Sequence, residues 1–535
     1  MYPFDSTLLD TNKVPEDQDR HAIQKICSEH SQDLERMNAQ IQRLESMLCS
    51  ITQKRDTLQS KVSSLKSIIS PLRNLPAEIL QHIFQDCLEP FPTISTQESP
   101  FLLTRICSRW RSVAVATPEL WAAIHVFMPQ AVHALEPHGA KCDAIREGVQ
   151  YFLSRSGTLP LSISLYSDAD GEHQDDLEEA TRTLDMLIPF LHRSKYLNLN
   201  APLVTMLPLQ RLEREGLGSL ETVILSRSRM LLHNEPDLSD ALLPLLHAPH
   251  LRRLWIGIAF PILQCTDWSK LTHLSIYPYI QGVKLGDIMV ILSMSPNLME
   301  CSIPLEGDFE GDTPLKPLSL TKLRRLTISS HGTGSATTNR FFDLLIVAVL
   351  QEFSIVEGRS WVHDSWPAVY PSIGGLFLRS SCPLLKFSIE ASYSGSRLPE
   401  GHARSMLGLL RFMTDLGELA LLNGDFINDD LLNALSVISP TSDVICPSLT
   451  RIRFRDAYAF SEKALMDFLS ARCSPPLGPV TPLEVVLDDP RPHLPSRLAQ
   501  FGQKIQFRPS YRISNSMQEL QTRGRLELRG WEDMT

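Results

Sequence analysis

The chain has 535 residues, 43% hydrophobic and 21% charged, and carries a formal net charge of −10 at pH 7. This composition predicts a folded chain of several domains with a large apolar core. It argues against a general nucleic-acid binder, because such proteins need a basic surface that releases counterions from the phosphates.

The cysteines and the apolar runs indicate a compartment. Ten cysteines are scattered from Cys27 to Cys473 with no Cys-x-x-Cys pair, a pattern typical of small core residues in a reducing environment. No secretory signal is visible at the start of the chain, and the longest apolar run, Leu344–Leu350, is far shorter than a membrane span. We therefore expect a cytoplasmic or nuclear protein with no membrane partner.

The N-terminal part of the sequence predicts one long helix. Residues 1–15 are polar and interrupted by proline, which indicates a disordered lead-in. From Ile23 to Ile69, seam positions recur at alternating steps of four and three residues without Pro or Gly, and only His30 and Arg55 among them are polar. This pattern predicts a coiled-coil helix over residues 16–70, with a seam about 70 Å long.

The sequence leaves the partner of this seam open. Residues 23–69 could pair with a second copy as a homodimer, or the seam could fold back onto another part of the chain. In a parallel homodimer Lys61 would face Lys66 of the other copy, and the remaining flanking pairs are neutral. The flanking charges therefore do not choose between the alternatives.

Residues 71–126 carry three apolar helical patterns in about 50 residues, too few to bury this much apolar surface among themselves. The excess apolar surface must contact either the rest of the chain or a partner protein. Thr117 is predicted to be the N-cap of the third helix, with Pro118 in its first turn. Three short motifs mark the stretch, namely Leu75-Pro76-Ala77-Glu78, Cys107-Ser108-Arg109-Trp110-Arg111 and Leu120-Trp121.

These motifs resemble an F-box, although the segment Glu89–Pro100 is longer than the usual first connection. The resemblance extends to F-box proteins with N-terminal heptads, a type abundant in mushroom-forming fungi. It implies docking onto a Skp-type adaptor and, through the adaptor, onto a cullin. The adaptor-binding residues that the resemblance implies are Leu75, Pro76, Ile79, Leu80, Ile83, Ile106, Trp110 and Trp121.

Residues 127–190 are predicted to connect the F-box-like stretch to the repeats. Ala140–Leu153 has helical periodicity, and Leu159–Tyr166 alternates with period two, as a strand does. The acidic run Asp168–Glu179 is interpreted as a solvated loop, because it lacks the ordered oxygen ligands of a calcium site.

The rest of the chain is a repeat of the form Leu-x-x-Leu-x-Leu, each copy preceded by an apolar helical run. A strand and a helix in about 20–34 residues are typical of an irregular leucine-rich-repeat solenoid, predicted here over residues 191–490 with a cap or tail over 491–535. The fold class is therefore α+β multidomain. Copies start at Leu220, Leu251, Leu271, Leu298, Leu323, Leu350, Leu384, Leu416 and Leu449, with a degenerate copy at Pro482 and a partial one at Tyr196.

Motifs of enzymes and metal sites are missing from the sequence. There is no Gly-rich phosphate loop, no Gly-x-Ser-x-Gly elbow and no His-Glu-x-x-His, and no His pairs with Cys at metal-ligand spacing. We therefore expect no intrinsic enzyme activity, no cofactor and no metal.

In a repeat of this type, the leucines point into the core and the residues between them line the opposite face of the strands. Trp255 beside Arg253 and Tyr277 has the composition of a binding hot spot, although Trp255 could instead pack under a neighbouring loop. Arg451, Arg453 and Arg455 on one strand would suit an acidic or phosphorylated ligand.

Taken together, these patterns predict a substrate-recognition subunit of an SCF-type ubiquitin ligase, in which the repeats bind a protein substrate. The alternative is a coiled-coil scaffold that holds the adaptor without presenting a substrate. An enzyme would need a pocket in which several polar side chains converge, and the repeat sequence does not predict one.

Overall fold

The structure is a computed structural model, and the chain divides into two compact units, Met1–His82 and Ile83–Thr535. It describes residues 9, 12–131, 138–169, 174–226, 239–257, 267–276, 285–305, 316–330, 335–357, 366–391, 402–422, 427–436, 445–455, 460–473, 483–488 and 505–508.

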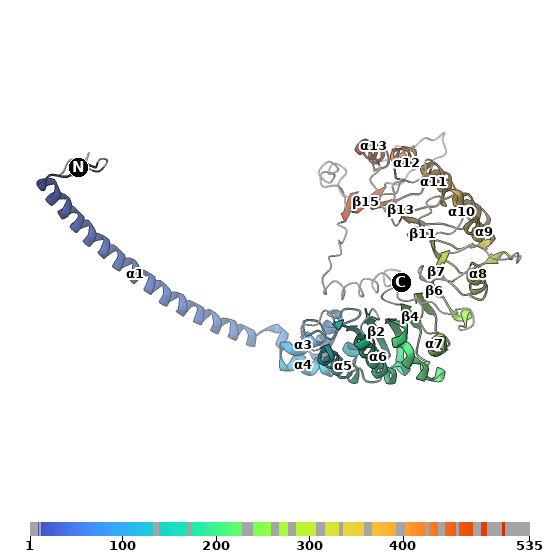
Figure 1. Cartoon of the computed structure of the whole chain (residues 1–535), viewed down its shortest axis with the longest axis horizontal. Coiled ribbons are helices and arrows are strands. Elements are labelled where there is room, and N and C mark those ends of the chain that lie inside the picture. Colours follow the sequence, from blue (N-terminus) through green and yellow to red (C-terminus); the bar gives the residue numbers. More distant parts are fainter. Residues whose placement is uncertain are drawn as a thin grey trace. The chain divides into compact units, whose positions relative to one another are not determined.

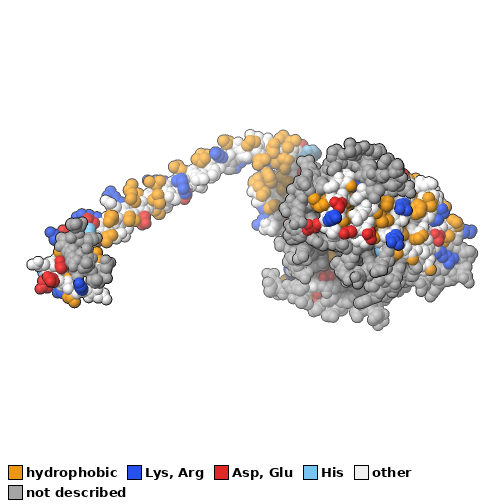
Figure 2. Space-filling view, turned by 90° about the horizontal axis from the view of Figure 1, so that it is seen from above, with side chains coloured by type: hydrophobic (Ala, Val, Ile, Leu, Met, Phe, Trp, Pro, Cys, Tyr) orange, Lys and Arg blue, Asp and Glu red, His pale blue; other side chains and the backbone are white. Residues whose placement is uncertain are grey.

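The first unit is built on α1, a helix of 52 residues from Asp17 to Ile68. Asp17 and Asp19 in the first turn and Lys66 in the last turn complement the helix dipole. The helix ends just before Ser70-Pro71, because a residue that precedes proline avoids the α conformation. The predicted helix over residues 16–70 is confirmed, and hydrophobic side chains lie exposed along it (Figure 2).

Residues 71–126 form short helices, and two details differ from the prediction. The expected second helix is interrupted at Cys107, which is fully extended and whose Sγ accepts a hydrogen bond from the Trp110 N–H at 3.4 Å. Thr117 does not cap the next turn, because its hydroxyl donates to the Val113 carbonyl at 2.7 Å. The helices are α2 (Ala77–Asp86), α3 (Phe101–Ile106) and α4 (Ser108–Val115), with 3-10 turns at Pro71–Arg73 and Pro118–Trp121.

Among the described residues, fourteen strands form one parallel sheet in which each strand pairs with the next along the chain, while β8 (Leu318–Ser319) and β10 (Leu345–Ile346) pair separately. The strands of the large sheet are β1 (Ala123–Met128), β2 (Leu161–Ser167), β3 (Ser194–Asn200), β4 (Thr222–Ser226), β5 (Arg253–Gly257), β6 (His273–Ile276), β7 (Glu300–Leu305), β9 (Arg325–Ser330), β11 (Glu352–Glu357), β12 (Lys386–Ala391), β13 (Glu418–Leu422), β14 (Arg451–Arg455), β15 (Glu484–Asp488) and β16 (Ile505–Arg508).

Helices connect many of these strands, as parallel pairing requires, and α7 to α13 cover one face of the repeat sheet (Figure 1). We call the opposite face the strand face. The α-helices that follow β1 along the described chain are α5 (His138–Ser154), α6 (Gln174–Leu187), α7 (Ser239–Leu246), α8 (Leu285–Ser293), α9 (Ser335–Leu344), α10 (Trp366–Ser380), α11 (His402–Leu410), α12 (Asp429–Ser436) and α13 (Glu462–Cys473).

The core of the repeats consists of the alternate strand residues that face the helices. In β5, Leu254 and Ile256 are fully buried, while Arg253 and Trp255 on the other face are half-buried. Aromatic residues stack in the same core, as in Phe353 and Phe387, whose ring centroids are 5.9 Å apart. Successive copies therefore share one continuous core, and the prediction of a strand-and-helix repeat is confirmed.

The sheet extends beyond the predicted repeat at both ends. It begins at β1, which starts at the end of the F-box-like stretch, and continues through β2, which lies where a strand was predicted over Leu159–Tyr166. At the other end, β16 pairs with β15 in parallel and places a strand at Gln506 and Phe507, whereas Arg525–Leu528 lies outside the described residues.

The acidic run was wrongly interpreted as a loop. Its second half begins α6, and Asp176 and Glu179 are 4% and 8% exposed. Elsewhere, no helix among the described residues is long and apolar enough to cross a membrane.

Candidate functional site

The strand face presents side chains in rows, because the parallel strands are paired in register. Residues at the same position of successive copies lie about 4.8 Å apart across the sheet. The first row consists of basic and acidic residues that alternate from His273 onward, and we call it the charge ladder. It comprises Arg253, His273, Glu300, Arg325, Glu352, Lys386, Glu418, Arg451 and Glu484.

Neighbouring members of the charge ladder form ion pairs. Glu418 lies 3.5 Å from Lys386 on one side and 3.6 Å from Arg451 on the other. Arg451 also contacts Glu484 at 2.8 Å. These charges are therefore largely neutralised within the sheet, by pairs that each contribute about 0–1 kcal/mol because they are solvent-exposed.

The middle of the charge ladder is more enclosed. Glu300 contacts His273 at 3.2 Å and also pairs with Arg325. Burial by itself would raise the pKa of Glu300, but the hydrogen bond and charge of His273, together with the charge of Arg325, lower it overall. Glu300 is therefore an ionised carboxylate at neutral pH, held between two cationic or hydrogen-bonding side chains.

A second row beside the charge ladder consists of small hydroxyl side chains, and we call it the hydroxyl row. The Ser388 hydroxyl donates to the Ser354 hydroxyl at 2.6 Å across two strands. Hydroxyls both donate and accept hydrogen bonds, and their small size lets a ligand approach the backbone closely. The members of the hydroxyl row are Ser275, Ser302, Thr327, Ser354 and Ser388.

The predicted hot-spot residues lie at one end of these rows. Arg253 begins the charge ladder, and Trp255 is in register with Ser275 of the hydroxyl row. Both side chains are half-buried, so part of the Trp255 ring is accessible to solvent and part is packed against the protein. Tyr277 lies outside the described residues.

The three arginines of β14 lie at the other end, and carboxylates of nearby strands contact two of them. Arg451 and Arg455 are accessible on the strand face, but Arg451 is paired with two carboxylates and Arg455 contacts Glu390 at 3.4 Å. Arg453 occupies the same line as the hydroxyl row. Sequence alternation placed these residues on the correct face but did not show that acidic residues of neighbouring copies neutralise two of them.

The residues predicted to bind an adaptor differ in accessibility. Four of them are exposed, two are half-buried and two are buried. The exposed residues are Pro76, Ile79, Ile83 and Ile106; the half-buried ones are Leu75 and Trp110.

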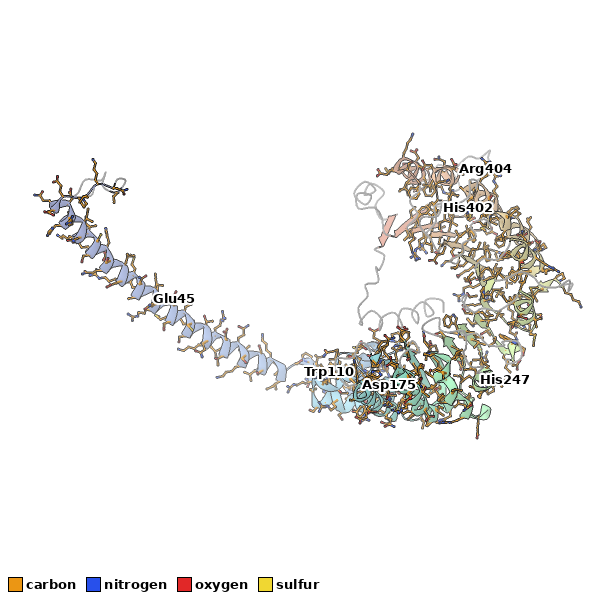
Figure 3. All side chains as sticks on the ribbon, in the orientation of Figure 1. Glu45, Trp110, Asp175, His247, His402 and Arg404 are labelled. Carbon is orange, nitrogen blue, oxygen red and sulfur yellow. The ribbon has the colours of Figure 1, made fainter. Side chains whose placement is uncertain are left out.

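Leu80 and Trp121 are each 0% exposed, so they offer no surface to a partner, and their prediction as contact residues is wrong. Trp110 packs beside Phe84, with ring centroids 4.9 Å apart, and is labelled in Figure 3. Ile79 and Ile83 are 45% and 37% exposed and lie one turn apart on α2, whereas Ile106 is 55% exposed at the end of α3. The available apolar surface is thus narrower than the motif implied.

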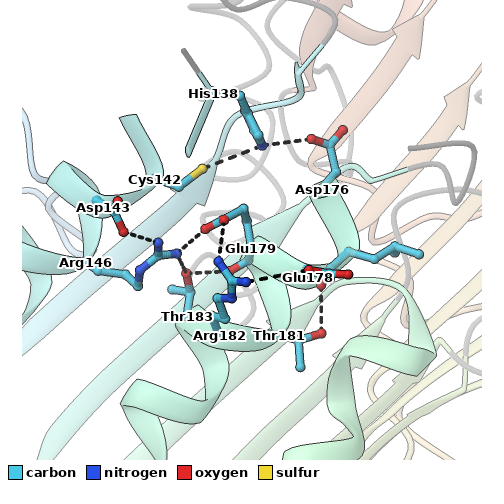
Figure 4. Close-up of polar contacts among 11 residues, drawn as sticks. His138, Cys142, Asp143, Arg146, Asp176, Glu178, Glu179, Thr181, Arg182 and Thr183 are labelled. Atoms are coloured by element: carbon cyan, nitrogen blue, oxygen red, sulfur yellow. Dashed lines mark hydrogen bonds and ion pairs between the residues drawn. The ribbon is translucent and has the colours of Figure 1, made fainter. Parts of the chain in front are cut away.

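A buried network between α5 and α6 contains titratable side chains, including a cysteine whose thiol is not reactive (Figure 4). His138 Nε2 lies 2.9 Å from Asp176 Oδ1 and 3.7 Å from Cys142 Sγ. Burial, followed by the negative charge of Glu179, raises the pKa of Cys142 to about 11. The thiol is therefore protonated at neutral pH and is not a nucleophile.

The same network explains why the acidic run folds as a helix. Arg146 of α5 contacts Glu179 at 2.5 Å and Thr183 Oγ1 at 3.5 Å (Figure 4). The carboxylate of Asp176 accepts the Ala131 N–H at 3.0 Å. Buried acidic groups are thus paired on both sides, as desolvated charges require. Among the described residues, no cluster of three or more His, Cys, Asp or Glu could hold a metal ion.

Comparisons with known proteins add little to this geometry. No protein-family model matches the chain, and no curated protein matches it. Among solved structures, the chain is similar to one in the crystal structure of the TLR13–ssRNA13 complex, with 14% sequence identity and a TM-score of 0.25. That match covers 55% of this chain and 41% of the other chain. A TM-score at this level does not establish a shared fold.

Proposed function

We propose that the protein is a substrate-recognition subunit of an SCF-type ubiquitin ligase. In this proposal residues 71–126 are an F-box that docks a Skp-type adaptor, and the repeats are leucine-rich repeats that bind a protein substrate. Catalysis would reside in other subunits of the complex. The observation that carries the proposal is the F-box-like motif set together with the exposed Ile79, Ile83 and Ile106.

The exposed isoleucines support docking for a physical reason. Exposed branched apolar side chains raise the free energy of the chain in water, and covering them with a second surface lowers it. A motif residue such as Pro76, which is exposed at the start of α2, would fix the chain direction at such an interface. Leu80 and Trp121 would then support the helices from inside rather than contact the adaptor.

The hydroxyl row supports substrate binding by the repeats. Ser275 is buried, so the accessible part of the row runs from Ser302 of β7 to Ser388 of β12. It spans three strand spacings, about 14 Å, which matches about four residues of an extended polypeptide. Its hydroxyls can bond to peptide N–H and C=O groups of any sequence, while Trp255 at one end and Arg453 at the other differ in chemistry. The row would therefore bind an extended polar segment in a defined direction.

The adaptor proposal predicts that the double variant Ile79→Asp/Ile83→Asp loses adaptor binding by about 100-fold, because two charged groups would be buried at the interface. The full-length chain should keep its circular dichroism spectrum, since both positions are exposed. Binding of a purified Skp-type adaptor is the measurement. Leu378→Asp is the matched control, because Leu378 is 65% exposed on α10. Undiminished adaptor binding by the double variant would contradict the proposal.

Substrate binding by the strand face is tested with a second double variant. Thr327→Arg/Ser354→Arg should block the hydroxyl row while adaptor binding stays unchanged, because surface changes usually cost under about 0.5 kcal/mol each. The measurement is ubiquitylation of a co-purifying protein by the reconstituted ligase, which should be lost with this variant and retained with Leu378→Asp. Retention of every ubiquitylated protein by the blocked variant would rule out the strand face as the recognition surface.

A further inference from the structure

The seam of α1 is an apolar surface that reaches along the whole helix. From Leu34 to Ile69, every apolar seam residue is between 49% and 77% exposed. In heptad letters the seam has two sets of positions. The a positions are Cys27, Leu34, Ile41, Leu48, Arg55, Val62 and Ile69, and the d positions are Ile23, His30, Met37, Leu44, Ile51, Leu58 and Leu65.

A parallel, in-register pair of such helices would be poorly matched. Each residue of the seam would face its own copy, so Arg55 would meet Arg55 and His30 would meet His30 in the core. Lys61 at a g position would face Lys66 at the following e position on both sides. None of the g–e pairs in this arrangement joins opposite charges.

An antiparallel pair centred between Leu44 and Leu48 removes these conflicts. Each a position then shares a core layer with a d position of the other copy. Arg55 meets Met37, and the two Arg55 layers are separated by about 27 Å. The seven unique layers are Ile23 with Ile69, Cys27 with Leu65, His30 with Val62, Leu34 with Leu58, Met37 with Arg55, Ile41 with Ile51, and Leu44 with Leu48.

The intrachain contacts of Arg55 suit its place in this core. The guanidinium lies 2.6 Å from the carboxylate of Asp56, which occupies a b position outside the seam. The charged end can therefore stay in water while the methylene stem packs against Met37 of the other copy.

The g positions give the clearest sign of self-complementarity. In an antiparallel pair g faces g, with an axial offset of about 3 Å in this register. Asp33 then faces Lys61 twice by symmetry, and Asp33 has a second carboxylate oxygen besides the one 3.1 Å from Arg36. The full set contains no pair of like charges, with Ile26 against Ile68, Asp33 against Lys61, Gln40 against Lys54, and Met47 against Met47.

The e positions are polar, and one of their pairs is unfavourable. Glu45, which projects from α1 in Figure 3, would face Glu45 of the other copy near the symmetry axis. This single exposed like-charge pair is outweighed by two Asp33–Lys61 pairs and by the apolar g contacts, because each exposed charge pair is weak.

We propose that the α1 seam binds the α1 seam of a second copy of this chain in the antiparallel orientation, with Leu44 against Leu48. The proposal does not depend on the adaptor or on a substrate. In this dimer the two copies of Ile68 lie about 66 Å apart, at opposite ends of the helix pair. The residues that follow α1 in each copy therefore begin at opposite ends of the dimer.

The charge pattern provides the first test on the full-length chain, by sedimentation equilibrium. Wild type should be a dimer, and Lys61→Glu should weaken the dimer by about tenfold, because it turns two attractions into two repulsions. Adding Asp33→Lys should restore it. A parallel dimer would instead be strengthened by Lys61→Glu, because the new carboxylate would attract Lys66 of the other copy. Lys25→Glu, with the same charge change on the outer face, is the matched control and should leave the affinity unchanged.

Disulfide formation provides the second test. In the antiparallel dimer the two Cys27 residues are about 57 Å apart, so mild oxidation should not join them, whereas the variant Leu65→Cys should link position 65 to Cys27 of the other copy. Mass spectrometry of the linked peptides reads this out. A Cys27–Cys27 link would show a parallel pair and overturn the proposal. A chain that stays monomeric at tens of micromolar would also overturn it, and would favour the intramolecular alternative.

Discussion

Replacing Trp121 with Ala should lower the free energy of unfolding of the Ile83–Thr535 unit by about 3–5 kcal/mol, as large cavities in protein cores do. Trp121 is 0% exposed, and its Nε1–H donates to the Ala114 carbonyl at 2.8 Å. Its ring packs edge-on against Phe101 at 5.5 Å and Phe152 at 5.1 Å between centroids. The substitution would therefore remove both a hydrogen bond and the centre of an aromatic cluster.

The measurement is the midpoint and slope of urea unfolding. Trp121→Phe is the matched control, because it keeps an aromatic ring while losing the hydrogen bond, and it should cost about 1–3 kcal/mol. If Trp121→Ala left stability unchanged and removed only adaptor binding, Trp121 would be a contact residue after all. The same variant thus decides between the role that the motif implied and the role that burial indicates.

Trp121 also illustrates where sequence reasoning stops. The motif Leu120-Trp121 could be located from residue order alone, but whether a large apolar side chain faces a partner or the core depends on what packs over it. Here Phe101 and Phe152 come from two different helices, and their convergence is a tertiary contact that local periodicity does not encode. The break between α3 and α4 has a different, local cause, because the extended Cys107 accepts the Trp110 N–H and begins a new helix.

The repeats were more predictable because their signal is repeated. Each copy places apolar residues at the same spacing, so the inward residues of strands such as β5 and β14 followed from alternation alone. The charge ladder could have been found in the same way, by aligning the copies and comparing the residue before each central apolar position. Arg325, Glu352 and Lys386 occupy that position in consecutive copies.

The acidic run was not predictable from the same rules. Local composition favoured solvent, and only the fold brings Arg146 to Glu179 and His138 to Asp176. Burial of a carboxylate depends on a partner that lies more than thirty residues away in sequence. Sequence patterns therefore defined the helix, the strands and their faces, whereas the pairing of charges had to come from the three-dimensional register.

The stability of the second unit should fall as the pH falls from about 6.5 to about 4, and His402 is the identified cause. Burial lowers the pKa of His402 from 6.5 to about 4, and the residue is 3% exposed at the start of α11 (Figure 3). Its Nε2 lies 2.8 Å from the Tyr370 hydroxyl of α10. The neutral ring therefore joins the helices of two successive repeats.

The direction of the effect follows from proton binding. Between pH 6.5 and 4 the unfolded chain binds a proton at His402 and the native chain does not, so stability decreases with decreasing pH in this window. Each pH unit is worth about 1.4 kcal/mol, which gives a loss of about 3 kcal/mol at pH 4 relative to pH 7.5. Above pH 6.5 the histidine is neutral in both states and contributes no pH dependence.

The measurement is urea unfolding of wild type and His402→Gln at pH 7.5 and pH 4.5. Gln cannot be protonated, so the variant should be less stable than wild type at pH 7.5 but should lose about 2–3 kcal/mol less on acidification. Carboxylates such as Glu300 add a pH dependence that both proteins share, so the difference between the proteins isolates His402. His250→Gln, at an exposed position, should behave as wild type. Equal losses in wild type and His402→Gln would show that the ring does not remain neutral in the folded chain.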